Sequence, residues 1–193
     1  MGIIFVDFYG VIIKFIGNSY SSPQLAFFRN FFALIPIILL LIITRDIKNI
    51  FVDISKKFLF LCFLRGISFV LMQIFYYISI INMNFATATT LTFSSPIFIV
   101  VLSMLVLKEK IGLFRWSAIF IGFGGVLFIM NPTSDLFSYI SILPLLAALC
   151  WAISNIVLKF IPEDISSVKI NFYSINFSYI AVSYTHLTLP TSG

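Results

Sequence analysis

The chain has 193 residues, of which 61% are hydrophobic and 10% are charged. A water-soluble domain of this size needs more charged surface, and it has too little interior to bury so many apolar side chains. The net charge of +5 does not indicate nucleic-acid binding, because the basic residues lie between apolar runs and form no basic stripe. The runs are about twenty residues long, enough to cross a bilayer. We therefore expect an all-α integral membrane protein, built as a polytopic helix bundle.

Seven apolar segments follow one another, and each is predicted to form a helix in the membrane. Most are apolar on every side, as in helices of a membrane bundle. Gaps that often contain proline or glycine separate them. The segments are Gly2–Ile16, Leu25–Ile43, Phe58–Ile81, Phe85–Leu107, Gly112–Met130, Tyr139–Ile161 and Val168–Ala181.

Basic residues occupy alternate loops between these segments. The loops Thr44–Lys57 and Lys108–Arg115 carry Lys and Arg, whereas the gaps 17–24, 82–84 and 131–138 carry neither. Loops rich in Lys and Arg face the cytoplasm. This pattern predicts a multi-pass protein of the bacterial inner membrane with a cytoplasmic N-terminus.

Part of the first segment recurs in the sixth. Lys14-Phe15-Ile16 reappears as Lys159-Phe160-Ile161, and Ser21-Ser22 reappears as Ser166-Ser167. A second copy that starts after five helices enters the membrane from the opposite side. The pattern therefore predicts an inverted repeat, which is an architecture of many secondary transporters.

The composition changes near Ala181. The stretch Val182–Gly193, with the single histidine His186, looks like the translation of a sequencing-library adapter, so we exclude it from functional reasoning. We predict a first five-helix repeat over residues 1–132, the start of a second, incomplete repeat over residues 133–181, and an artefact over residues 182–193.

Several short motifs, in this order and spacing, resemble the drug/metabolite transporter superfamily and in particular its EamA-type bacterial members. The resemblance implies ten helices in two inverted five-helix repeats, with both termini cytoplasmic, and a transporter of small solutes. Here the first repeat is complete and the second is not. The motifs are Phe27-Phe28-Arg29, Thr92-Phe93-Ser94-Ser95-Pro96, Leu107-Lys108-Glu109-Lys110, Trp116-Ser117-Ala118, Ile121-Gly122-Phe123-Gly124-Gly125-Val126 and Asn131-Pro132.

Ionisable and polar side chains inside a span are costly and therefore mark candidate sites. In the third segment Arg65, Gln73 and Tyr76 are predicted to share a face that lines a polar cavity and attracts an anionic group. The alternative is that Arg65 extends back to the headgroups. Arg29 has the same two interpretations near the outer end of the second segment.

Three further groups complete the substrate-binding prediction. Thr89, Thr92 and Ser95 lie near Pro96, whose ring removes a backbone hydrogen bond, and helix irregularity often marks a transporter site. Trp151 and Asn155 are one turn apart and suit stacking on, and hydrogen bonding to, a polar solute. For the group near Pro96 the alternative is a kink that serves only packing. For Trp151 and Asn155 the alternative is a hydrogen bond between helices.

Lys14 and Lys159 are interpreted as interfacial anchors, with a symmetric gating role left open. The small residues Gly122, Gly124 and Gly125 are interpreted as structural, for close helix packing, since no lysine-containing phosphate loop accompanies them. Cys62 and Cys150 form no metal-ligand pattern. We expect no metal, no cofactor and no nucleic acid.

The predicted function is secondary transport of a small metabolite by alternating access, with the solute and the lipid bilayer as partners. A homodimer is left open. The alternatives are a channel or assembly subunit without transport activity and, less favoured, an intramembrane enzyme. Enzymes of that kind need paired acids or a histidine constellation, which the spans do not provide. Asp7 is the only acid within a predicted span.

Overall fold

The computed structural model describes residues 22–44, 50–52, 54–130 and 139–188, and the elements in these ranges are helices. Four candidate spans, with α5 and α6 counted as one, are long and apolar enough to cross a membrane. The expected first segment Gly2–Ile16, with Asp7 and Lys14, lies outside the described residues. The elements are α2 (Ser22–Thr44), α4 (Lys56–Asn82), α5 (Phe85–Thr92), α6 (Ser95–Val106), α7 (Leu113–Met130), the short 3-10 helix η2 (Tyr139–Ser141), α8 (Ile142–Leu158) and α9 (Ser167–Thr188).

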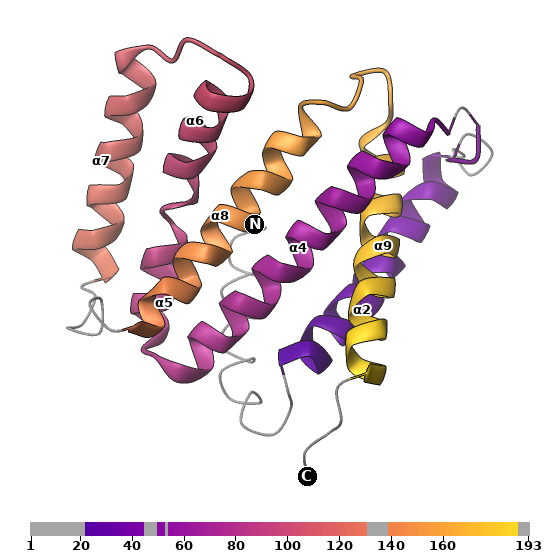
Figure 1. Cartoon of the computed structure of the whole chain (residues 1–193), viewed down its shortest axis with the longest axis horizontal. Helices are drawn as coiled ribbons and strands as arrows, with labels where there is room; N and C mark the ends of the chain where they lie inside the picture. Colours follow the sequence, from indigo (N-terminus) through magenta and orange to yellow (C-terminus); the bar gives the residue numbers. More distant parts are fainter. Residues whose placement is uncertain (1–21, 45–49, 53, 131–138, 189–193) are drawn as a thin grey trace.

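Helix α4 lies in the middle of the bundle. It packs along α8 on one side and along α9 on the other, while α2 packs on α9 and α6 packs on α8 (Figure 1). Helix α7 forms the edge of the bundle opposite α2 and α9, and it contacts α5. Side-chain caps fix where two of these helices begin. Ser55 Oγ accepts from the Phe58 amide at 3.1 Å, and Asn84 Oδ1 accepts from the Ala86 amide at 3.0 Å.

The predicted segment Phe85–Leu107 is two helices, α5 and α6, joined by a turn at Phe93 and Ser94. Pro96 lies in the first turn of α6, where its missing N–H is not needed. The Ser94 hydroxyl donates to the Leu91 carbonyl at 2.6 Å across the turn. The break therefore lies just before the proline and separates two short helices within one span.

Helices α4 and α9 approach each other closely at Gly66. A Cβ atom at this position would lie 2.7 Å from the Ser174 carbonyl oxygen and 3.3 Å from the Ser178 nitrogen. The Ser178 hydroxyl donates to the Gly66 carbonyl at 3.0 Å and to the Ser174 carbonyl at 2.8 Å. A small residue is thus required at this contact, as at many helix pairs in membranes.

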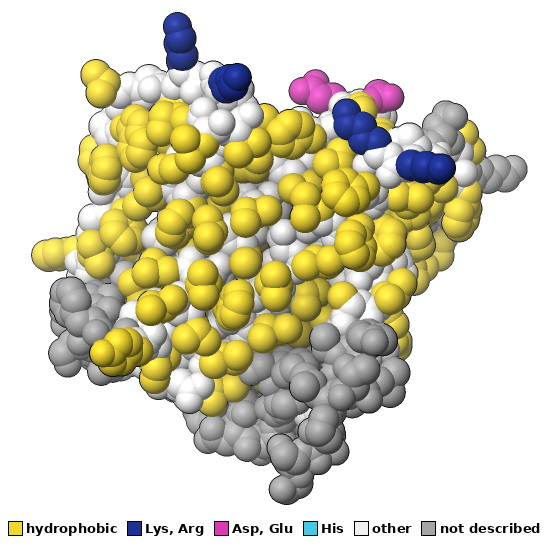
Figure 2. Space-filling view, viewed as in Figure 1, with side chains coloured by type: hydrophobic (Ala, Val, Ile, Leu, Met, Phe, Trp, Pro, Cys, Tyr) yellow, Lys and Arg dark blue, Asp and Glu magenta, His cyan; other side chains and the backbone are white. Residues whose placement is uncertain are grey.

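Charged side chains gather at one end of the bundle (Figure 2). This end contains the start of α4, the connection between α6 and α7, and the connection between α8 and α9 (Figure 1). The alternation of basic loops predicts this placement. The charged residues there are Lys56, Lys57, Lys108, Glu109, Lys110, Arg115, Lys159, Glu163, Asp164 and Lys169.

Two residues of α9 hold the segment before α4 at this end. The Lys169 ammonium donates to the Val52 carbonyl and lies 5.7 Å from the centre of the Phe58 ring. The Tyr173 hydroxyl donates to the Ile50 carbonyl at 3.2 Å. These contacts hold residues 50–52 against the first turns of α9.

The close packing predicted for the glycines of α7 has no partner among the described residues and stays a prediction. A Cβ atom at Gly122, Gly124 or Gly125 would meet nothing within 4 Å among the described residues. The half-buried side of α7 carries the larger residues Trp116 and Phe123. Within the described part of the chain, the glycine side of α7 is therefore uncovered.

Helix α9 crosses the expected compositional boundary at Ala181 without interruption and ends at Thr188. Val182 is fully buried in a cluster with Ala26, Val70 and Tyr77. The helix thus shows no structural break at Ala181. The exclusion of Val182–Gly193 and the division into two repeats stay predictions.

We expect Gly66→Ala to lower the free energy of unfolding by about 1–3 kcal/mol, because the added methyl group overpacks the contact with α9. The matched control is Gly122→Ala, where the methyl group enters open space and the change stays within about 1 kcal/mol. Denaturant unfolding in detergent micelles measures both. Equal losses for the two variants would contradict the close approach at Gly66.

Candidate solute site

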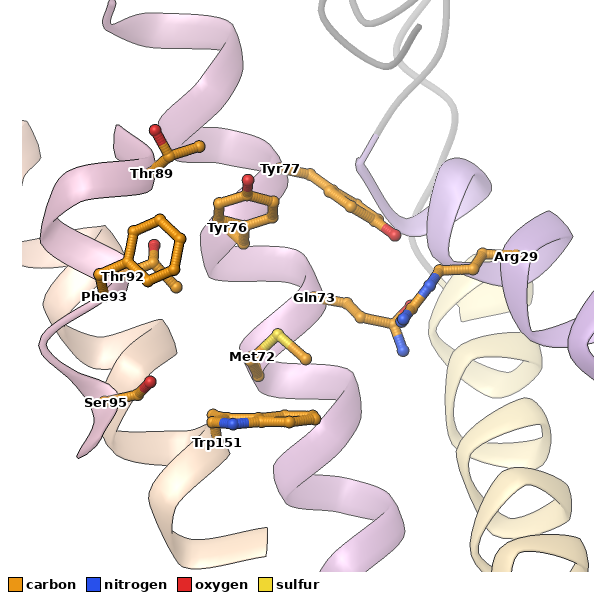
Figure 3. A pocket seen from close by; sticks show the side chains of 10 residues that line it. All are labelled: Arg29, Met72, Gln73, Tyr76, Tyr77, Thr89, Thr92, Phe93, Ser95 and Trp151. Atoms are coloured by element: carbon orange, nitrogen blue, oxygen red, sulfur yellow. The ribbon is translucent and has the colours of Figure 1, made fainter. Parts of the chain in front are cut away.

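A cavity of about 360 Å³ lies beside α4 in the half of the bundle away from the charged end (Figures 1 and 3). Its volume is in the range of small-molecule sites, about 300–1,000 Å³. Its lining is mostly apolar, with polar groups from several helices. The lining residues are Arg29, Met72, Gln73, Tyr76, Tyr77, Thr89, Thr92, Phe93, Ser95 and Trp151.

The middle of the cavity is aromatic. Tyr76 projects from α4 between the α5 side and the α2 side, and Trp151 of α8 lies along the same wall (Figure 3). Phe69 connects this wall to α2, because its ring centre lies 5.7 Å from that of Trp151 and 5.0 Å from the Arg29 guanidinium carbon. These contacts order the cation and the aromatic rings together.

The α5 side of the cavity carries two threonine hydroxyls. Thr89 donates to the carbonyls of Phe85 at 2.8 Å and Ala86 at 3.0 Å, and Thr92 donates to the Ala88 carbonyl at 2.9 Å. The turn after α5 then brings Phe93 and Ser95 to the same wall. The helix break thus joins side chains of two helical segments at one surface.

The α2 side contains a buried amide pair. Gln73 Nε2 donates to Asn30 Oδ1 at 3.1 Å, and each residue is only 1% exposed. Asn30 Nδ2 and Gln73 Oε1 have no hydrogen-bond partner among the described residues. Each unmatched buried polar atom costs free energy, so the pair retains one donor and one acceptor that are not satisfied.

Asn30 was not among the predicted site residues. The available signal was an amide in an otherwise apolar segment, next to Arg29. Because α2 is apolar on all sides, the sequence alone does not show which face of the helix meets α4.

Seven of the predicted site residues meet in this cavity: Arg29, Gln73, Tyr76, Thr89, Thr92, Ser95 and Trp151. They come from α2, α4, α5, α6 and α8. Arg29 is the one cation on the described lining, and that lining includes no carboxylate.

Arg65 is not among the residues that line this cavity with Gln73 and Tyr76, and its part in solute binding stays a prediction. It is partly buried at another level of α4, and its Nε has no hydrogen-bond partner among the described residues. Arg65 and Gln73 are eight residues apart, which separates them by about 12 Å along the helix axis. The two side chains can therefore share a face of α4 without reaching the same cavity. Arg29, from another helix, supplies the positive charge instead.

Two other predicted residues point their polar groups elsewhere. The Asn155 amide donates to the Trp151 carbonyl of its own helix at 2.8 Å, and Asn155 is not on the lining. Lys159 pairs with Glu109 at 2.9 Å at the charged end, with both side chains more than a third exposed. Such an exposed pair contributes about 0–1 kcal/mol to stability.

Among the described residues no group of three or more His, Cys, Asp or Glu side chains is close enough to hold a metal ion. The described lining of this cavity offers one cation, an amide, hydroxyl groups and aromatic rings.

The sequence matches the model of the EamA-like transporter family over residues 1–131. The chain belongs to this family. The match covers more than half of the chain and includes α2 to α7. The family is described as one of transporters.

Several curated EamA-type relatives are similar to the chain. An S-adenosylmethionine uptake transporter of Rickettsia bellii is 31% identical over 166 residues, covering 85% of this chain and 55% of the relative. A riboflavin transporter of Rhizobium johnstonii is 39% identical over 72 residues, covering 37% of this chain and 24% of the relative. An uncharacterised transporter of Bacillus subtilis is 28% identical over 163 residues, covering 79% of this chain and 53% of the relative.

The chain spans about half the length, or less, of the curated relatives it matches. No solved structure matches the chain significantly.

We expect Gln73→Leu and Asn30→Leu each to lower the free energy of unfolding by about 1–3 kcal/mol, because each leaves the other amide buried without a partner. In the double variant the free energy of unfolding should fall by less than the sum of the two single losses, since no amide is then left buried without a partner. Denaturant unfolding of the parent chain, the two single variants and the double variant in one detergent gives the coupling free energy between Asn30 and Gln73. Strictly additive losses would contradict an energetic link between Asn30 and Gln73.

Proposed function

We propose that the chain is part of a secondary transporter that moves a small metabolite across the bacterial inner membrane by alternating access, with the cavity beside α4 as its solute site. The observation that carries this proposal is the convergence of polar side chains from α2, α4, α5 and α6 in an otherwise apolar, membrane-length bundle. Polar groups inside a membrane are costly and are usually functional. Family membership and the names of the relatives support a small-molecule cargo.

The cavity belongs to the half of the bundle away from the charged end, and Arg29 is the one basic residue on its described lining. Thr89 is close to the start of α5, and Tyr76 and Tyr77 are close to the end of α4. Both of these helix ends lie opposite the charged end (Figure 1). If the charged end faces the cytoplasm, as the basic loops predict, the cavity is the outer half of the solute route.

At the charged end, the ion pair between Lys159 and Glu109 links the end of α8 to the connection between α6 and α7. We propose that this link holds the cytoplasmic end of the half-bundle together. Lys14, the predicted counterpart of Lys159 in the first repeat, lies outside the described residues. A symmetric gating role for the two lysines stays a prediction.

The orientation can be measured with a membrane-impermeant maleimide on intact cells. In a background with Cys62 and Cys150 replaced by alanine, we expect Asn84→Cys to react and Lys110→Cys and Glu163→Cys to react only after the membrane is opened. Asn84 lies at the uncharged end, whereas the other two lie at the charged end. Labelling of Lys110→Cys but not Asn84→Cys in intact cells would reverse the proposed orientation.

Transport can be measured with the chain reconstituted in lipid vesicles and labelled S-adenosylmethionine or riboflavin outside. We expect uptake of at least one of the two, and a loss of about tenfold in Arg29→Gln, because a charge-assisted hydrogen bond in the cavity is removed. Arg115→Gln, at the exposed start of α7, is the matched control and should leave uptake unchanged. Uptake no faster than in protein-free vesicles for both solutes would argue against transport of these solutes by the chain. An equal loss of uptake in Arg29→Gln and Arg115→Gln would argue against the cavity as the solute site.

A further inference from the structure

Aromatic rings lie at the end of the cavity that is nearer to the charged end of the bundle. Trp151 lies past Met72, on the side of the cavity away from Tyr76 (Figure 3). Because α4 begins at the charged end and its residue numbers rise away from it, this side of the cavity faces the charged end (Figure 1). The Trp151 indole is therefore the inner boundary of the cavity.

Phe69 lies next to this boundary and contacts both walls of the cavity. It precedes Met72 by three residues of α4, which places it about 4.5 Å nearer to the charged end. Its ring centre lies 5.7 Å from that of Trp151 on α8 and 5.0 Å from the guanidinium carbon of Arg29 on α2. Phe69 itself is not on the described lining. One ring thus links α2 and α8 across α4.

The contact between Phe69 and Arg29 restrains a cation. A guanidinium over an aromatic ring is attracted by the negative face of the ring, and the attraction grows where water is excluded. Arg29 also lines the cavity, so the ring restrains the one cation that a solute would meet on the described lining. Ordering a long side chain before a ligand arrives lowers the entropic cost of binding.

Arg65 lies on the other side of Phe69. It precedes Phe69 by four residues on the same face of α4, about 6 Å farther toward the charged end. Its side chain is half-buried, and its Nε has no hydrogen-bond partner among the described residues. A solute that moves along this face of α4 from the cavity must displace the rings of Phe69 and Trp151 before it meets Arg65. Apolar constrictions exclude water and polar solutes.

We propose that Phe69 is a positioning residue of the solute site, which holds Arg29 at the cavity and, together with Trp151, closes the route between the cavity and Arg65. This inference rests on the proposed function, since it names a further residue of the same site. The two roles use different properties of the side chain. Bulk closes the route, whereas the aromatic face holds Arg29. Leucine keeps much of the bulk and lacks the aromatic face, alanine lacks both, and tyrosine keeps both.

Thiol labelling tests the closure. With both native cysteines replaced by alanine, a membrane-impermeant methanethiosulfonate is added on the side from which Asn84→Cys reacts. We expect Met72→Cys to react and Arg65→Cys to react slowly. Adding Phe69→Ala should accelerate the reaction of Arg65→Cys by about tenfold, which corresponds to a barrier lower by about 1.4 kcal/mol. Adding Phe69→Leu or Phe69→Tyr should leave it slow.

Two controls separate an opened route from a disturbed fold. Phe60→Ala removes the same ring from α4, at a residue that is 62% exposed on the outside of the described bundle, and should leave Arg65→Cys slow. Ala147→Cys, which is fully buried in α8, should stay unreactive when Phe69→Ala is added. Reaction of Ala147→Cys would reveal general unfolding, and the comparison of Phe69→Leu with Phe69→Tyr then decides.

Charge selectivity at Met72→Cys tests the positioning of Arg29. Anionic and cationic methanethiosulfonates are compared, and the ratio of their rates is divided by the ratio for a free thiol in solution. A cation near Met72 raises this ratio. We expect Phe69→Leu to lower it by about threefold, because the attraction that holds Arg29 is lost. Phe69→Tyr should keep the ratio, and Arg29→Gln gives its value without the cation.

The outcomes separate this inference from the proposed function. Arg65→Cys reacting as fast as Met72→Cys while Phe69 is present would overturn the inference, and so would an unchanged charge ratio in Phe69→Leu. An acceleration by Phe60→Ala equal to that by Phe69→Ala would also overturn it. If any of these is found while vesicles take up labelled S-adenosylmethionine or riboflavin, the inference fails and the transporter proposal stands. If Met72→Cys reacts from neither side and no uptake is observed, both fail.

Discussion

The absence of water inside a bilayer is the constraint on which this structure depends. Every polar group in a span must find a partner within the protein, and the nearest partner is the helix that carries it. Ser68, Ser79 and Asn176 each donate to a carbonyl four residues earlier, at 2.9, 2.6 and 2.8 Å. These side chains are satisfied locally and leave their helices free to pack through apolar surfaces. The polar contacts that cross between helices therefore stand out, and few of them are present among the described residues.

Two such contacts fix the position of α4. The Ser178 hydroxyl reaches the Gly66 carbonyl on the α9 side, and Gln73 reaches Asn30 of α2. The first requires a residue without a side chain, and the second requires two amides at one level of the bundle. Together they determine the rotation of α4, and thereby which of its side chains face the cavity. Tyr76, about one turn beyond Gln73, is placed on the cavity by the same rotation.

The positions of the helices could be predicted from the sequence, because span length, caps and proline act locally. Segments Leu25–Ile43 and Phe58–Ile81 differ from α2 and α4 by a few residues at each end, and the irregularity expected near Pro96 is a break between α5 and α6. The pairing of helix faces could not be predicted, because helices that are apolar all round have no periodicity that marks a buried side. Arg65 was therefore grouped with the cavity residues, as Arg29 of α2 was, and Asn30 was missed. Seven of the nine predicted solute-binding residues do line the cavity, since polar side chains in spans converge where they can share partners.

The back-bonded threonines show how one constraint produces both stability and chemistry. By donating to Phe85, Ala86 and Ala88, the hydroxyls of α5 avoid an unsatisfied proton in an apolar region. The same bonds occupy the hydroxyl protons, so these side chains are not free to donate to another group. A hydroxyl that could rotate would accept from one solute and donate to another, and it would discriminate little between them. Because the protons are held by the helix, the hydroxyls of α5 are ordered before any ligand is present, and an ordered wall lowers the entropic cost of binding.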